Sequence, residues 1–99
     1  MSFTAEEVKE AIKDVKHPEI NDTLINLGIV KDVKVEDGKI IITINLPFPQ
    51  VPEVIVSMFI QDLKGPLSKF NAEVVYKRTY MTKEEVDRFL KLEQEGWRF

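Results

Sequence analysis

Two stretches rich in β-branched residues, separated by one dipeptide, constrain the fold of this chain most. Residues 29–36 and 39–46 flank Asp37-Gly38, a pair that readily takes the positive φ angles of a two-residue turn. Side chains alternate between the two faces of a strand, so the second stretch has an apolar face that should be buried: Ile40, Ile42, Ile44 and Leu46. Its other face carries Ile41, Thr43 and Asn45. The sequence therefore predicts an antiparallel hairpin with one face on the core.

Two helix starts are marked by capping boxes, at Thr4 to Glu7 and at Thr82 to Glu85. The first predicts a helix from about Ala5 to Lys16, which Pro18 stops because the residue before a proline disfavours the helical region. The second predicts a C-terminal helix at about 83–95, broken by Gly96. Its buried face should hold three apolar residues: Val86, Phe89 and Leu90.

Between these parts lies a proline-rich loop that leads into a further helix. Residues 47–52 contain three prolines, which cannot continue a sheet ladder, and Pro52 suits a first helical turn. The buried side of this helix is predicted as Ile55, Met58, Phe59 and Leu63, and Gly65-Pro66 should end or kink it. Residues 72–80 predict a third strand. The expected fold is α+β in the order α-β-β-α-β-α, a small sheet covered by helices, in a single domain of residues 1–99.

Composition excludes several classes of function. The chain has no cysteine, which rules out disulfides, thiolate metal sites and cysteine nucleophiles. Its formal net charge is -3 and its basic residues are scattered, so nucleic-acid binding is not expected. Apolar runs are too short to span a bilayer, and no secretory pattern opens the chain, so a cytoplasmic protein without a membrane segment is expected.

Three separated motifs together carry a resemblance to a known family. They are residues 17–19 (His-Pro-Glu), residues 24–30 (Leu-Ile-Asn-Leu-Gly-Ile-Val), and residues 49–52 (Pro-Gln-Val-Pro) at the start of a helix. In this order and spacing the chain resembles the SufT/PaaD-like domain of iron-sulfur cluster assembly proteins, over roughly residues 5–80. The resemblance implies an α+β domain and a part in maturing iron-sulfur proteins. Some members of that family instead assist assembly of a multicomponent oxygenase.

The chain departs from the pattern of the resembled family at its polar positions. The family's reactive cysteine corresponds to Val51, its nearby threonine to Pro47, and the two aspartates of its other motifs to His17 and Asn26. Valine has no thiolate to ligate iron, so a cysteine-based transfer role does not carry over. The resemblance then implies an adaptor that contacts iron-sulfur assembly or recipient proteins, with no cofactor of its own.

Each candidate site residue also has a structural explanation. His17 and Glu19 are weak as a metal or acid-base pair, because a helix-end histidine is usually solvated and a carboxylate there often caps a turn. Asn26 is more typical of a turn cap. The loop around Phe48, Pro49 and Val51 is either a stiff docking surface or a cover for the sheet end, and the sequence favours neither.

The aromatic tail and the missing catalytic motifs complete the sequence predictions. Trp97 and Phe99 either pack the last helix onto the domain or serve as interface anchors, including those of a homodimer. With one histidine and no Gly-x-Ser-x-Gly setting, hydrolysis is disfavoured, and no catalytic or metal-binding residue is assigned. The alternatives to an adaptor are an enzyme or small-molecule binder that uses His17 and Glu19, and a dimerisation module.

Overall fold

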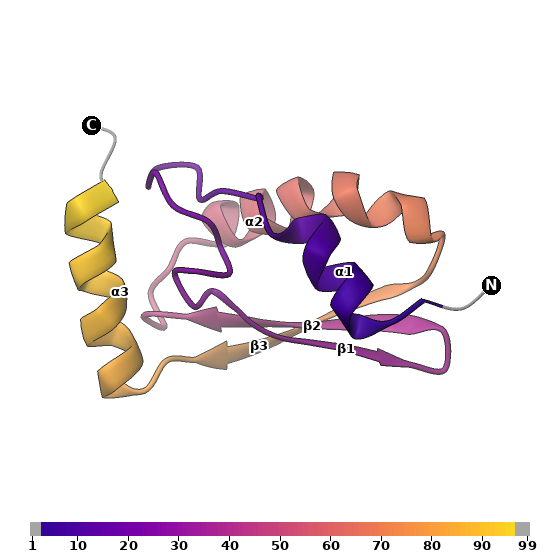
Figure 1. Ribbon diagram of the computed structural model, residues 1–99. Helices are drawn as coiled ribbons and strands as arrows, with labels where there is room; N and C mark the ends of the chain where they lie inside the picture. The colour runs from indigo at the N-terminus through magenta and orange to yellow at the C-terminus, as the bar shows by residue number, and fades with distance from the viewer. Residues whose placement is uncertain (1–2, 97–99) are drawn as a thin grey trace.

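The computed structural model describes residues 3–96 of the chain, and it has the predicted element order α-β-β-α-β-α (Figure 1). The predicted α+β fold is therefore confirmed. The elements are α1 (Ala5–Ile12), β1 (Val30–Glu36), β2 (Lys39–Leu46), α2 (Glu53–Leu67), a short 3-10 turn η1 (Ser68–Phe70), β3 (Val74–Tyr80) and α3 (Lys83–Gly96). Trp97 and Phe99 lie outside the described residues.

The sheet is mixed and has the order β1-β2-β3. Strands β1 and β2 form the predicted antiparallel hairpin, in which Asp37 and Gly38 take φ angles of 50° and 76°. Strand β3 pairs with β2 in parallel, which requires a crossover, and α2 supplies it. Figure 1 shows α1 and α2 over one face of the sheet, with α3 standing across the end of it.

The core lies between the sheet and the helices α1 and α2. The predicted face of β2 is buried as expected, with Ile40, Ile42, Ile44 and Leu46 all at 2% exposure or less. Helices α1 and α2 cover it with Val8, Ile12, Val56, Phe59, Leu63 and Leu67. The proline loop follows directly after β2, so this packing also sets the position of the loop. The candidate site lies beside that loop.

Helix α1 is shorter than predicted. It starts at the expected capping box, in which Thr4 and Glu7 satisfy each other's backbone amides, but it ends at Ile12 rather than Lys16. The backbone beyond the helix bonds elsewhere: Val15 accepts from the Leu24 amide at 2.9 Å, and the His17 amide donates to the Asp22 carbonyl at 3.0 Å. These long-range bonds replace the last helical turn.

Helix α2 passes through Gly65-Pro66 and ends at Leu67, so the predicted stop comes slightly too early. A residue before proline normally leaves the helical region because its Cβ clashes with the ring, and Gly65 has no Cβ. The assignment of Met58 to the buried side was wrong, since it is 40% exposed and Val56 is buried instead.

Helix α3 starts at the predicted capping box, where the Thr82 amide donates to the Glu85 carboxylate and the Glu85 amide donates to the Thr82 hydroxyl. Of its predicted apolar face, Phe89 is buried but Leu90 is 38% exposed, which corrects that prediction. Gly96 is the last residue of the helix rather than outside it, and its carbonyl accepts from the Asn21 amide. None of the helices in residues 3–96 combines the length and apolar character needed to cross a bilayer.

Candidate functional site

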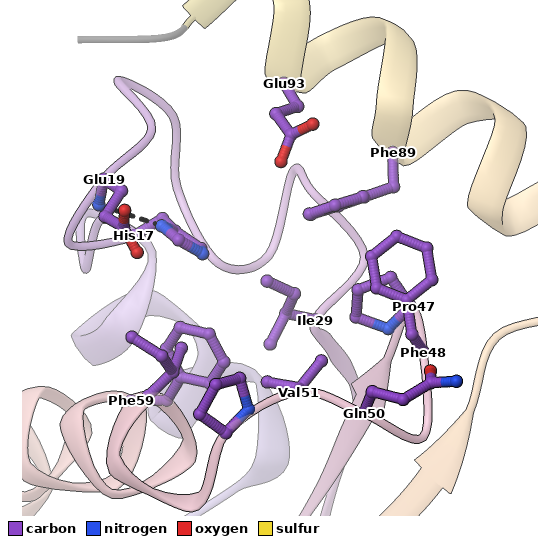
Figure 2. Close-up of a pocket in the computed structure, with 12 residues that line it drawn as sticks. His17, Glu19, Ile29, Pro47, Phe48, Gln50, Val51, Phe59, Phe89 and Glu93 are labelled. Carbon is purple, nitrogen blue, oxygen red and sulfur yellow. Dashed lines mark hydrogen bonds between the residues drawn. The ribbon is translucent and has the colours of Figure 1, made fainter. Parts of the chain in front are cut away.

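A pocket of about 230 Å³ lies where three distant parts of the chain meet. The connection after α1, the proline loop with the start of α2, and α3 each contribute a wall (Figure 2). The lining residues are His17, Glu19, Ile29, Pro47, Phe48, Gln50, Val51, Pro52, Ile55, Phe59, Phe89 and Glu93. All three motifs that carried the family resemblance thus contribute to one cavity: residues 17–19, residues 24–30 through Ile29, and residues 49–52.

His17 is a buried residue of this pocket, with 8% of its surface exposed, and not the solvated helix-end residue that the sequence predicted. Its Nδ1 accepts a hydrogen bond from the Glu19 amide at 3.0 Å, drawn as a dashed line in Figure 2. Its ring packs against Phe59 with 5.2 Å between the ring centroids. Because Nδ1 is an acceptor, the proton of the neutral imidazole resides on Nε2.

The proline loop forms the second wall. Val51 is half-buried, and in Figure 2 its side chain lies beside that of Ile29 at the floor of the cavity. Phe48 is 39% exposed, so its side chain is not part of the core. The loop turns tightly, with the Val51 amide donating to the Phe48 carbonyl at 3.4 Å. Pro52 then caps α2 with extended backbone angles and no side-chain hydrogen bond.

Asn26 and Pro49 do not line the pocket. Asn26 holds α3 to the loop before β1: the Arg88 guanidinium donates to its carbonyl and to its side-chain oxygen, and its amide group donates to Asp22. In the turn at residues 23–26 the capping side chain is that of Thr23, whose hydroxyl accepts from the Asn26 backbone amide. This residue serves packing between elements.

Sequence reasoning missed most of the lining residues, including Phe59, Phe89 and Glu93. Phe59 and Phe89 were predicted only as buried faces of their helices, and both also line the cavity. Glu93 was not predicted at all. The signal for it was present, because Glu93 lies four residues after Phe89 and therefore on the same helical face.

The lining of the pocket contains acidic but no permanently basic side chains. Glu19 and Glu93 are the carboxylates of the lining, which contains no lysine or arginine. Across residues 3–96, no group of three histidine, aspartate or glutamate side chains is arranged to hold a metal ion. The arrangement is suited to binding an apolar group beside two carboxylates.

Comparisons with known proteins agree with this architecture. Residues 5–75 match the family model described as iron-sulfur cluster assembly protein. A crystal structure of a domain of unknown function, DUF59, from Bacillus anthracis matches with a TM-score of 0.64 and 23% identity, over 92% of this chain and 91% of that one. At this identity the likeness shows the fold. No curated protein matches the chain.

Proposed function

Because the chain belongs to the iron-sulfur cluster assembly protein family, we propose that it is an accessory protein that acts on other proteins by contact and does not ligate the cluster itself. Family membership points to a role in iron-sulfur cluster assembly. The proposal that the protein acts by contact goes further than family membership alone indicates. The cluster is in this proposal the cargo of the partner proteins.

The observation that carries the proposal is the identity of the residue at the floor of the pocket. Val51 stands where the resembled family has its reactive cysteine, and the entire chain has no cysteine to take over that role. Iron-sulfur clusters are held predominantly by cysteine thiolates, which bind iron as charged sulfur. An aliphatic side chain supports an apolar contact at the same place.

The shape of the loop supports a contact role as well. Phe48 projects at the mouth of the pocket from a segment with prolines at 47, 49 and 52. A stiff loop loses little conformational entropy when a partner binds, so more of the contact energy remains as affinity. Aromatic residues in such positions are frequent anchors of protein interfaces.

Affinity capture from the source cell tests this proposal. Tagged wild type should recover cluster-assembly or cluster-receiving proteins, identified by quantitative mass spectrometry, and Val51→Arg should lose them because a guanidinium would fill the apolar cavity. Val54→Arg is the matched control. Val54 lies three residues after Val51 at the start of α2, is 65% exposed and does not line the pocket. Capture that contains no such protein would count against the function.

Iron analysis tests the mechanism separately. The protein purified without oxygen should be colourless and should contain far less than one iron per chain. A brown monomer with stoichiometric iron would show that oxygen and nitrogen ligands of this chain hold a cluster, and the contact mechanism would then be wrong.

Small-molecule binding in the same cavity is the second candidate, and the buried imidazole of His17 at its wall is the observation that favours it. A metabolite that raised the melting temperature of wild type, but not that of Val51→Arg, would support this alternative.

A further inference from the structure

The size of the pocket indicates what kind of group it can receive. Engineered cavities of about 150 Å³ accept benzene, whereas sites for drug-sized ligands or cofactors have about 300–1,000 Å³. At about 230 Å³, this cavity has room for one aromatic ring or one large aliphatic side chain. It is small for a complete cofactor.

The walls of the pocket indicate that this group is apolar. Phe48, Phe59 and Phe89 come from the loop, from α2 and from α3, so rings surround the cavity from three sides. Figure 2 shows Phe89 and Phe48 next to each other above the proline loop. Phe59 and Phe89 are buried at 2% and 3% exposure, and these two rings form a fixed apolar surface.

The charges at the edge indicate what must accompany the apolar group. Glu19 and Glu93 are both half-buried, and in the view of Figure 2 both lie on the side of the cavity away from Val51 and Gln50. Within residues 3–96 neither carboxylate forms an ion pair, although six other such pairs occur there. Complementary charge on a partner steers association and suppresses acidic competitors.

We infer that the pocket receives one bulky apolar side chain of a partner protein, presented by a segment with lysine or arginine next to it. This inference rests on the proposed function and names the chemistry of the partner. The apolar side chain lies among the phenylalanine rings, and the flanking cations meet Glu19 and Glu93.

Three synthetic peptides of equal length test the inference, each a glycine-serine chain around one central tripeptide: Lys-Phe-Lys, Glu-Phe-Glu or Lys-Ala-Lys. Nuclear magnetic resonance titration of the full chain gives the affinity and the residues whose signals shift. The Lys-Phe-Lys peptide should shift signals of Val51 and Phe89 and bind at least tenfold more tightly than either of the others. Equal affinity of the two phenylalanine peptides, or shifts elsewhere on the molecule, would overturn the inference.

Charge reversal on α3 provides the matched variants. Glu93→Lys should reduce the preference for Lys-Phe-Lys over Glu-Phe-Glu at least tenfold, whereas Glu95→Lys should leave it unchanged because Glu95 is exposed and outside the lining. Far-ultraviolet circular dichroism checks that both variants are folded. An identical effect of both substitutions would mean that only the net charge of the molecule matters, which contradicts a site.

The two proposals fail in different ways. If capture of assembly proteins requires Val51 but is insensitive to Glu19→Lys and Glu93→Lys, the function stands and the basic partner is wrong. If nothing is captured while the peptides behave as expected, the pocket chemistry stands and the function is wrong. A concentration-dependent mass in light scattering that Val51→Arg abolishes would assign the pocket to a second copy of this chain and overturn the inference.

Discussion

Asn45 is the residue at which strand alternation and burial disagree. Alternation puts it with Ile41 and Thr43 on the sheet face away from the core, yet it is fully buried. Its oxygen accepts from the Thr79 hydroxyl at 2.8 Å, and its amide donates to Glu85 at 3.3 Å. The start of α3 covers this end of the sheet, which no local pattern in β2 could indicate.

We expect Asn45→Leu to lower the free energy of unfolding by about 1–3 kcal/mol, because it removes the two hydrogen bonds of the buried Asn45 amide, each worth about 0.5–1.5 kcal/mol. Urea denaturation followed by circular dichroism measures this loss. Thr43→Val, on the same face of β2 and half-buried, is the control and should change stability by less than about 0.5 kcal/mol. Equal stability of wild type and Asn45→Leu would show that the network contributes nothing.

At the pocket, the sequence located the family-related residues but not the whole site. His17, Glu19 and Val51 could be selected because they belong to motifs with a fixed order in a resembled family. Phe48 was selected because it lies in the stiff proline loop. That these motifs face one another depends on how the loop after α1 packs against α2. The sequence places Glu93 on the same helical face as Phe89, but long-range contacts decide that this face of α3 lies against the pocket.

Among the elements, α3 combines weak attachment with a role in the site. It lies outside the residues 5–75 that match the family model, yet it supplies Phe89 and Glu93 to the pocket. In its described part it is held by one buried side chain, Phe89, by the partly buried Leu92 against the core, and by polar contacts through Glu85, Arg88 and Gly96.

Phe89→Ala should therefore release α3 before the rest of the molecule unfolds. Truncation of a buried phenylalanine removes about 3–5 kcal/mol of packing energy. Hydrogen exchange should show at least tenfold lower protection of α3 amides, with β2 amides much less affected. Leu90→Ala, at an exposed neighbour, should change neither. If β2 loses as much protection as α3, the helix is an inseparable part of the core.

The attachment of α3 should also depend on pH through Glu85. The Thr82 amide, followed by Lys31 and Asn45, holds the pKa of this carboxyl below its usual 4.5. A lowered pKa in the folded state adds stability above about pH 4.5, and this stability is lost as the pH falls through the folded-state value. Glu85→Gln should accordingly be less stable than wild type at neutral pH, with a difference that shrinks in acid.

Unfolding curves of wild type and Glu85→Gln at neutral pH and near pH 3 check this expectation. Glu84→Gln, on the exposed side of the same turn, is the control and should stay within about 0.5 kcal/mol of wild type at both values. A gap between wild type and Glu85→Gln that stayed constant with pH would mean that the carboxylate charge is irrelevant.

The helix starts and the hairpin could be predicted because their signals are local. Thr4, Thr82 and Asp37-Gly38 act through the hydrogen bonds and backbone angles of adjacent residues. The end of α1 could not be predicted, because hydrogen bonds to residues 22–24 decide where this helix stops. The parallel pairing of β3 likewise follows from the path of α2 across the sheet.

For the whole molecule, we propose that residues 1–99 form a single domain that unfolds in one cooperative step. The sheet and all three helices share contacts with one core cluster, which favours all-or-none behaviour at this size. Val51→Cys supplies the one thiol of the chain and allows a fluorescent label at the pocket. Urea transitions followed by this label and by circular dichroism should coincide, and separate midpoints would contradict a single unit.

The walls of the pocket span the chain from His17 to Glu93, and this has a consequence for synthesis. A nascent chain that has left the ribosome only as far as β3 can form its sheet and pack α2, but it has neither Phe89 nor Glu93 in place. Under the proposed function, a partner can therefore bind this pocket only after translation has delivered α3.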